Sequence, residues 1–440
     1  MTENNIFKIF IKYTSFNVLG MIALSCYIFA DTLFISMGIG IDGLTAINLA
    51  LPIFSLVNGS GLMIGMGGGT KYTLAVSRGK QQEGNKIFTN TLYMTAIFGI
   101  VFVILGIFFS GNIATLLGAD EQVMANTEIY LKMLLIFSPA FILNNIVQCF
   151  VRNDGAPHLS MIAMIVGSMS NMFLDWLFIF PFGMGMFGAV LATCLSPVFS
   201  LILTMQYFIR KKNTFHVVKT KISGKAIGGI IASGFPSFLT EISTGIVLIV
   251  FNFLFMKIAG NTGVAAYGVI ANLWFIVVSM FTGISQGMQP IMSHNYGKGK
   301  YGNVNKILKY GLILMGTFAA AIYAVMFFGS EYVAAIFYSE HNETLQYIAE
   351  EGLKLYYIAC PFVGFNIIIS IFFTSTEYPV PAHIISILRG FALIIPMAFI
   401  MLFAGGRIGL WMAFPVTEMI VTVIGIILYI MRNRKLKEHT

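Results

Sequence analysis

Four acidic residues lie inside long apolar stretches of this sequence: Asp31, Asp175, Glu241 and Glu418. An ionised carboxylate at the centre of a bilayer costs about 2.5 to 3.5 kcal/mol on insertion scales, so each of these acids needs to be neutralised. A proton, a metal cation, a basic partner or a positively charged substrate can neutralise a carboxylate. The four acids therefore indicate places where positive species bind.

Two of these acids have neutral oxygen donors that we expect at a similar depth. Asn171 precedes Asp175 by four residues, which places both side chains on one face of a helix. Asp31 and Thr193 are expected at the same outer-half depth on two further helices. Because oxygen ligands suit hard cations, Asp31, Asn171, Asp175 and Thr193 are a candidate Na⁺ site. Alternatively, Asn171 and Thr193 only tie helices together through hydrogen bonds.

The other two acids lead to different expectations. Glu241 lies near the expected midplane, just after Pro236, and is a candidate for holding a cationic substrate or relaying protons. Glu418 lies at a depth comparable to that of Arg389 on the neighbouring apolar stretch. For Glu418 a structural ion pair is therefore the favoured interpretation.

The elements that position these residues are transmembrane helices. Of the 440 residues, 57% are hydrophobic and only 10% are charged, whereas a soluble domain has roughly 25% charged residues. Apolar runs of 20 or more residues exclude a β-barrel and leave little room for a soluble catalytic domain. We therefore expect an all-α membrane protein with twelve transmembrane helices, near residues 14–37, 47–74, 91–115, 131–151, 158–180, 185–208, 230–256, 264–292, 308–330, 354–374, 380–404 and 408–431.

The distribution of Lys and Arg predicts the orientation of the chain. Basic residues occupy the N-terminal segment and every second loop, whereas Asp42, Asp120 and Glu121 occupy the alternate loops. Arg152 is counted here among the basic turns. By the positive-inside rule, both termini are expected in the cytoplasm of a cell-membrane protein. The net charge of +8 is explained in this way, so no nucleic-acid partner is expected.

The two halves of the chain repeat each other. At an offset of 220 residues, Gly40 corresponds to Gly260, and Asn85-Lys86-Ile87 corresponds to Asn305-Lys306-Ile307. We expect an N-terminal lobe over residues 1–208 that holds the cation site, a cytoplasmic linker over 209–228 and a C-terminal lobe over 229–440. Six helices per lobe give both lobes the same orientation, related by a pseudo-twofold axis along the membrane normal. Such lobes enclose a central cleft suited to alternating access.

Several motifs together resemble the multidrug and toxin extrusion (MATE) family, and within it the MepA-type prokaryotic branch. They include Asp31-Thr-Leu-Phe-Ile, Asn171-Met-Phe-Leu-Asp175, and Gly234-Phe-Pro236-Ser with Glu241. Gln286-Gly287-Met-Gln289-Pro290, followed by Asn295-Tyr-Gly297, completes the set.

The resemblance implies a cation-coupled antiporter, driven by Na⁺ or H⁺, that exports organic and mainly cationic compounds by alternating access. In family members that have a first-lobe cation site, its residues match Asp31, Asn145, Asn171, Asp175 and Thr193 of this chain. The family often has a proline early in the first helix, and here Ser15 to Gly20 contain none. Bending of the first helix at such a proline is therefore not expected.

Other function classes are less compatible with the sequence. A lipid-linked saccharide flippase of the same superfamily calls for a basic cleft, and an ion channel calls for rings of charge or carbonyl filters. The four cysteines show no CxxC spacing, and the glycine run Gly65–Gly69 is not followed by a Gly-Lys-Ser/Thr motif. We therefore expect no enzyme activity, no cofactor beyond the coupling ion, and a monomer with organic cations and the lipid bilayer as its partners.

Overall fold

The computed structural model describes residues 3–337 and 343–438, and in these ranges it contains helices but no strand. This confirms the all-α prediction. The helices are α1 (Glu3–Gly38), α2 (Ile41–Ser77), α3 (Gln81–Leu116), α4 (Met124–Ile136), α5 (Ser138–Asn153), α6 (Pro157–Ile179), α7 (Gly185–Ile209), α8 (Gly224–Gly297), α9 (Tyr301–Phe328), α10 (Ser330–Phe337), α11 (Glu343–Tyr356), α12 (Cys360–Ser375), α13 (Pro379–Ile387) and α14 (Ile394–Glu438).

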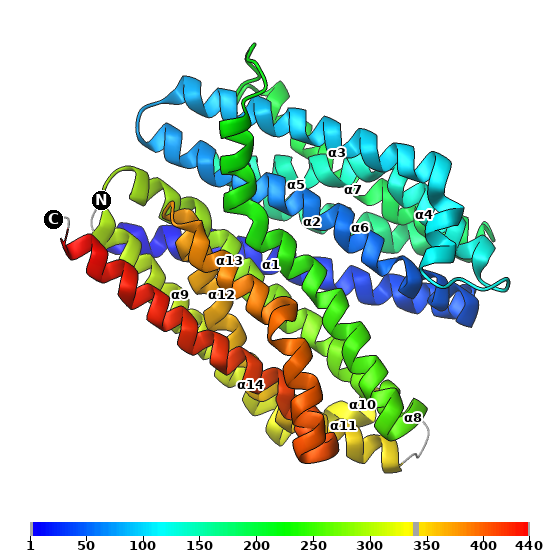
Figure 1. Cartoon of the computed structure of the whole chain (residues 1–440). Coiled ribbons are helices and arrows are strands. Elements are labelled where there is room, and N and C mark those ends of the chain that lie inside the picture. The colour runs from blue at the N-terminus through cyan, green and yellow to red at the C-terminus, as the bar shows by residue number, and fades with distance from the viewer. Residues whose placement is uncertain (1–2, 338–342, 439–440) are drawn as a thin grey trace.

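The helix lengths account for the twelve expected crossings. In the described part of the chain, nine helical segments are each long and apolar enough to cross a membrane. The pair α4 and α5, bent by 48° at Phe137, forms a tenth. Two of the nine, α8 with 74 residues and α14, contain a non-helical glycine. Figure 1 shows α8 running to the lower right and returning, so α8 contributes two crossings, and the break in α14 divides that helix in the same way.

Glycine is required at these two breaks because the backbone there has a positive φ. Gly260 has φ 58° and ψ −151°, and Gly406 has φ 57° and ψ −134°. Residues with a Cβ rarely adopt this conformation. Gly40, which corresponds to Gly260 in the sequence repeat, has φ 86° and ψ −158° just before α2. The repeat is therefore visible in backbone conformation as well as in residue type.

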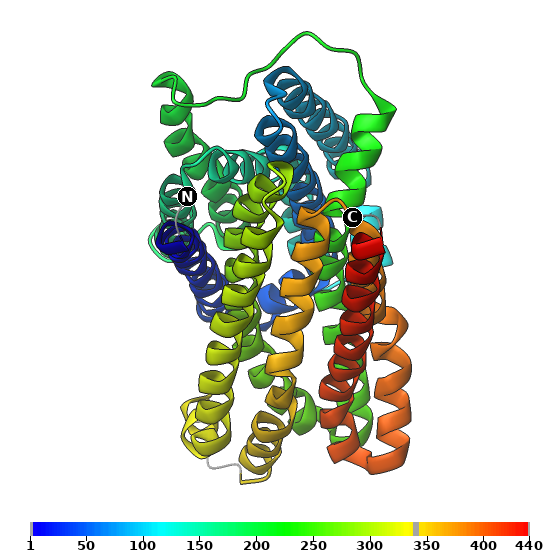
Figure 2. The ribbon, with the colours of Figure 1, turned by 90° about the vertical axis from the view of Figure 1, so that its left-hand side faces the viewer.

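The buried apolar side chains form two cores. One core is built mainly from α2 to α7, together with the end of α1 and Ile230. The other is built from α8 to α14 and also takes Ile6, Phe10 and Val18 from the first half of α1. Figures 1 and 2 show the corresponding two groups of helices, with α1 reaching from one group to the other. The lobe boundaries at 208 and 229 stay a prediction.

The segment between α7 and α8 is extended and packed against the protein. It passes over the outer side of α3, at the top of Figures 1 and 2. Phe215, in the middle of this segment, is buried among the rings of Phe88, Phe150 and Phe208. The predicted linker thus has a fixed path, and α8 begins at Gly224, within the predicted linker range of 209–228.

Candidate functional site: a cavity between the two helix groups

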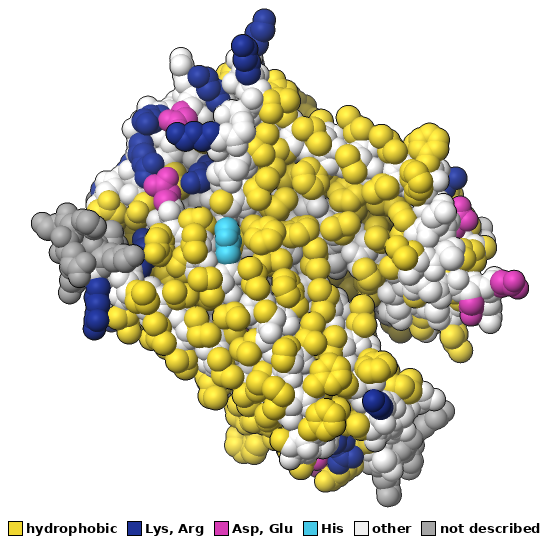
Figure 3. Space-filling model, viewed as in Figure 1, with side chains coloured by type: hydrophobic (Ala, Val, Ile, Leu, Met, Phe, Trp, Pro, Cys, Tyr) yellow, Lys and Arg dark blue, Asp and Glu magenta, His cyan; other side chains and the backbone are white. Residues whose placement is uncertain are grey.

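A cavity of about 310 Å³ lies between the two groups of helices, and its wall includes residues of α1, α2, α5, α6, α7, α8, α12 and α14. Figure 3 shows the hollow between the two groups opening on the right-hand side. The connection between α3 and α4, which carries Asp120 and Glu121, lies at this end of the molecule (Figure 1). The cavity is therefore open toward the end that carries acidic loops.

Contacts between the two groups close the opposite end. Arg78, which follows α2, forms an ion pair with Glu377, which lies between α12 and α13. Deeper in the molecule, Asn153 Nδ2 on α5 donates to Gln289 Oε1 on α8 at 3.1 Å. Gln289 Nε2 donates in turn to Thr70 Oγ1 on α2 at 2.9 Å. These polar contacts join the helix groups at the basic end of the molecule.

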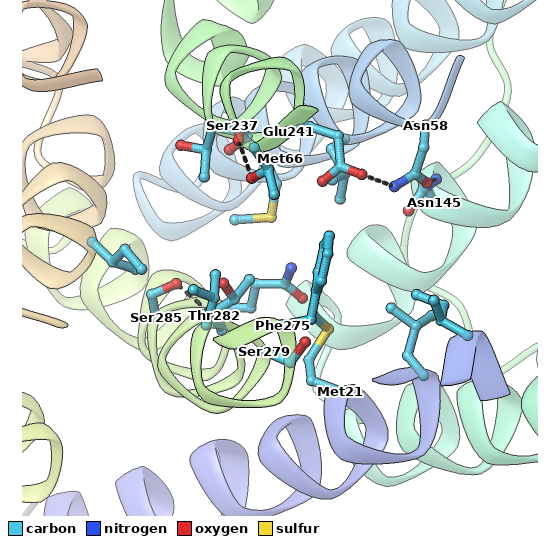
Figure 4. Close-up of a pocket in the computed structure, with 18 of the residues that line it drawn as sticks. Met21, Asn58, Met66, Asn145, Ser237, Glu241, Phe275, Ser279, Thr282 and Ser285 are labelled. Carbon is cyan, nitrogen blue, oxygen red and sulfur yellow. Dashed lines mark hydrogen bonds between the residues drawn. The ribbon is translucent and has the colours of Figure 1, made fainter. Parts of the chain in front are cut away.

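Glu241 on α8 lines the cavity (Figure 4). Its Oε1 accepts a hydrogen bond of 2.9 Å from Asn58 Nδ2 on α2. Asn145 Nδ2 on α5 donates to Asn58 Oδ1 at 2.9 Å. No ion pair within 4 Å reaches Glu241 from the side chains that the structure describes. Glu241 is thus a carboxylate held by a neutral amide in a cavity that a ligand can enter.

Asp31 on α1 and Asp175 on α6 come together behind the cavity wall. Asp31 is 8% exposed, Asp175 is 0% exposed, and their side chains interact directly. One oxygen of each carboxylate has no hydrogen-bond partner in the described structure. Two ionised carboxylates whose side chains interact directly repel each other, so the pair requires a shared proton or a cation.

Asn171 and Thr193 complete this group. When the Asn171 amide is oriented so that its oxygen accepts from the Thr193 backbone N–H at 3.2 Å, its nitrogen donates to Asp175 Oδ2 at 3.0 Å. The Thr193 hydroxyl donates to the Ala189 carbonyl at 3.2 Å. The structure therefore brings together Asp31, Asn171, Asp175 and Thr193, which supply the oxygen donors that suit a hard cation.

Asn145 is placed elsewhere. Its side-chain hydrogen bonds join it to Asn58 and to the Phe141 carbonyl, on the Glu241 side of the cavity.

Sequence reasoning also missed Tyr27, which lines the cavity one helical turn before Asp31. The four-residue spacing from Tyr27 to Asp31 was the available signal, because it places both side chains on one face of α1.

Glu418 and Arg389 form the predicted ion pair. Arg389 Nε donates to Glu418 Oε1 at 3.1 Å, and Asn366 Nδ2 on α12 donates to Glu418 Oε2 at 2.7 Å. Arg389 lies in a π-helical segment, Leu388–Ala392, which interrupts the regular helix between α13 and α14. This acid of the second half is thus neutralised by the protein itself.

Arg152 corrects the sequence analysis, which counted it among the basic turns at the surface. It lies in the last turn of α5, is 1% exposed, and lines the cavity. Its Nη1 donates to Asn17 Oδ1 on α1 and to Gln286 Oε1 on α8, both at 2.9 Å. Arg152 therefore joins α5 to both helices at the closed end. No sequence signal separated it from the surface basic residues.

Comparisons with known proteins agree with this architecture. The MatE family model matches residues 18–177 and 236–400, which is most of the chain. The chain belongs to the MATE family of transporters. It is 28% identical to the multidrug export protein MepA of Staphylococcus saprophyticus over 394 residues, covering 89% of this chain and 86% of that protein. The MepA protein of Staphylococcus aureus is 27% identical with the same coverage.

Solved structures of MATE proteins share the fold. A crystal structure of MATE in complex with MaL6 has a TM-score of 0.92 and 22% identity, covering 98% of this chain and 97% of that one. The outward-facing conformation of a multidrug resistance MATE family transporter of the MOP superfamily has a TM-score of 0.91 and 22% identity, with 98% and 96% covered. The family and the apolar helices identify this chain as a membrane protein of a transporter family, not of an enzyme family.

Proposed function

We propose that this chain is a cation-coupled antiporter that exports organic, mainly cationic compounds by alternating access. The observation that carries the proposal is the arrangement of two separate acidic positions. Glu241 faces the cavity, and Asp31 meets Asp175 behind the cavity wall, with no basic partner for either position among the described side chains. Multidrug export by the MepA relatives supports the same conclusion.

In this proposal, Glu241 attracts the substrate cation while Asp31 and Asp175 bind the coupling cation. A ligand shifts a conformational equilibrium only if it binds the two states with different affinity. Binding of the coupling cation neutralises the carboxylate pair, the helices that carry it repack, and the net negative charge around the substrate falls, which weakens its binding at Glu241. The substrate then leaves on the side from which the coupling cation came.

The direction of transport follows from the loop charges. If the basic end is cytoplasmic, as the positive-inside rule indicates, both termini are cytoplasmic and the present conformation is open to the outside. The contacts of Arg152 and Arg78 then form the closed cytoplasmic side. We further propose that the protein acts as a monomer in the cell membrane, without a cofactor other than the coupling ion.

We favour Na⁺ over H⁺ as the coupling ion. A proton requires only a carboxylate, whereas Na⁺ also uses neutral oxygens. Asn171 and Thr193 carry such oxygens within the same hydrogen-bonded group as Asp175. A flippase for anionic lipid-linked saccharides is less well supported, because Arg389 is already paired with Glu418 and Arg152 lies in the closed interface.

The test is dye transport by the purified protein in liposomes under one imposed gradient at a time. A Na⁺ gradient at constant pH should drive transport of a cationic dye. If only a pH gradient drives it, the Na⁺ assignment is wrong and proton antiport stands. If neither gradient drives movement of a cationic dye, the antiport proposal fails.

A further inference from the structure

One face of α3 changes from polar to apolar along its length. At steps of three and four residues, it carries Asn85 and Thr89, then Leu92, Ala96 and Gly99. Residues at this spacing share a single stripe of a helix. The polar part of the stripe is covered by protein, and the apolar part faces out of the molecule as the floor of a groove.

The cover of the polar part is the segment 213–223, here called the strap. Its backbone N–H groups at His216, Val218 and Ser223 donate to Asn85 Oδ1, Thr89 Oγ1 and Asn90 Oδ1 at 3.0 to 3.1 Å. Polar side chains of a helix thus take the place of a neighbouring strand and satisfy an extended backbone. The strap is a fixed part of this surface.

Further hydrogen bonds hold the strap near its start, at Thr214, and near its end, at Thr220. Asp154, after α5, accepts hydrogen bonds from the Thr214 backbone N–H at 2.8 Å and from the Tyr207 hydroxyl at 2.9 Å. The Tyr93 hydroxyl donates to the Thr220 carbonyl at 3.2 Å. Tyr93 is the next residue after Leu92, where the apolar groove begins. The strap therefore ends its path along α3 at the mouth of the groove.

The outward side of the strap combines positive charge with apolar side chains. Lys219 and Lys221 flank Thr220 and are exposed, and Val217 and Ile222 are 67% and 60% exposed. Figure 3 shows dark blue Lys and Arg side chains gathered at this end, beside a broad yellow apolar surface. Lysines beside exposed apolar residues suit the boundary between lipid headgroups and acyl chains.

The groove below the strap has a volume of about 390 Å³ and lies between α3 and α5. A small residue, Gly99, forms part of its floor and packs against Pro139. A Cβ added to Gly99 would lie 3.1 Å from the Pro139 Cγ, so the close packing of α3 and α5 at this point depends on glycine. Its walls are apolar and include Leu92, Ile100 and Leu143. Its apolar lining fits a hydrocarbon chain.

The depth of the groove agrees with a lipid ligand. The 36 residues of α3 span about 54 Å, whereas the hydrocarbon core of a bilayer is about 30 Å thick. The first turns of α3, under the strap, therefore extend into the headgroup region. The apolar residues from Leu92 onward reach the hydrocarbon region, where no water competes for the groove.

We propose that the strap and the groove together form a binding site for an anionic phospholipid. Lys219 and Lys221 contact the phosphate and the rest of the anionic headgroup, and one acyl chain lies in the groove between α3 and α5. The docked backbone of the strap holds the two lysines above the groove. The site is separate from the central cavity and does not depend on the substrate of the transporter.

Native mass spectrometry of the purified full-length protein tests the site. Phosphatidylglycerol and phosphatidylcholine with identical acyl chains serve as probes. The wild type should prefer phosphatidylglycerol, and Lys219→Gln/Lys221→Gln should weaken its binding about tenfold. The matched control Lys298→Gln/Lys300→Gln removes the same charge from the turn between α8 and α9, and should leave the binding unchanged. Equal effects of both variants, or no effect of the strap variant, would overturn the proposal.

Two further variants separate the parts of the site. Ala96→Trp fills the groove and should weaken binding of both lipids while leaving binding of free glycerol phosphate unaltered. If it leaves phosphatidylglycerol binding unchanged, the lysines bind only the phosphate group and the lipid assignment is wrong.

Asn85→Ala/Thr89→Ala releases the strap without changing any charge and should also weaken phosphatidylglycerol binding. Wild-type affinity in that variant would contradict a site formed by the docked strap.

Discussion

The two halves of this protein share a backbone plan but treat their buried acids in opposite ways. In the first half, Asp31 and Asp175 meet each other with Asn171 beside them, and no basic side chain pairs with them in the described structure. In the second half, Glu418 is held by Arg389 and Asn366. A carboxylate with its own arginine is neutral as a unit, whereas a carboxylate pair needs an external positive species.

The comparison is close because the repeat aligns the surroundings of these acids. In the alignment of the halves, Asn144 corresponds to Asn366 and Thr193 corresponds to Thr417. The position after Thr193 is Cys194, and the position after Thr417 is Glu418. The halves therefore carry their buried acids at different positions: the second half has Glu418 directly after its repeated threonine, whereas the first half has Asp31 and Asp175 on other helices.

The largest effect is expected where the ion pair is broken. Arg389→Met leaves Glu418 buried without its partner, which should lower the free energy of unfolding by about 3 to 5 kcal/mol. Replacing both residues, as in Arg389→Met/Glu418→Met, should restore most of that stability. Thermal unfolding in detergent measures both variants. A single variant as stable as the wild type would show that the pair does not neutralise Glu418.

The carboxylate pair should respond in the opposite way. Asp31→Asn and Asp175→Asn each remove a repulsive charge, so we expect the protein to stay folded while gradient-driven dye transport falls by about 100-fold. Transport in liposomes, with Asp42→Asn at the surface as the matched control, measures this effect. Wild-type rates in both pair variants would remove the coupling role from the first half.

Glu241 sharpens the comparison, because it belongs to the second half but, among the side chains that the structure describes, only the Asn58 amide forms a hydrogen bond with it. Glu241→Gln should raise the KM for a cationic dye about tenfold, because the dye loses an attractive charge interaction worth about 1.4 kcal/mol of binding free energy. The KM for a neutral dye should stay the same. An equal change for both dyes would point to altered cavity shape and not to charge recognition.

The smallest effect is expected on stability, from a substitution at the positive-φ glycine Gly260. Gly260→Ala places a Cβ where φ is 58°, which should cost about 1 kcal/mol of stability. Gly245→Ala, in the same long helix and with open space around it, is the control and should be neutral or slightly stabilising. Equal stabilities of the two variants would mean that the turn at Gly260 tolerates other backbone conformations.

Much of the fold was available from the sequence. Long apolar runs fix the number of membrane crossings, because every backbone polar group in a bilayer must be bonded within its own helix. Gly40 and Gly260 correspond in the sequence repeat, and both have a positive φ in the structure. Spacing along a single helix predicted that Asn171 and Asp175 would lie together, because that relation is local.

Contacts between helices were only partly available. Similar depth correctly brought Asp31, Asp175 and Thr193 together, whereas Asn145, which was included only because the family resemblance implied it, hydrogen-bonds to Asn58. Depth fixes one coordinate, whereas the direction in which a helix faces depends on how it packs against its neighbours.

The sequence by itself determined the helices, their repeat and the presence of uncompensated acids, since these follow from composition and local spacing. Only the tertiary structure decided that Asn58 holds Glu241, that Arg152 is buried among α1, α5 and α8, and that the polar linker is docked on α3. The physical reason is that neutralisation and burial depend on groups far apart in the chain, and helix packing alone brings those groups within a few ångströms.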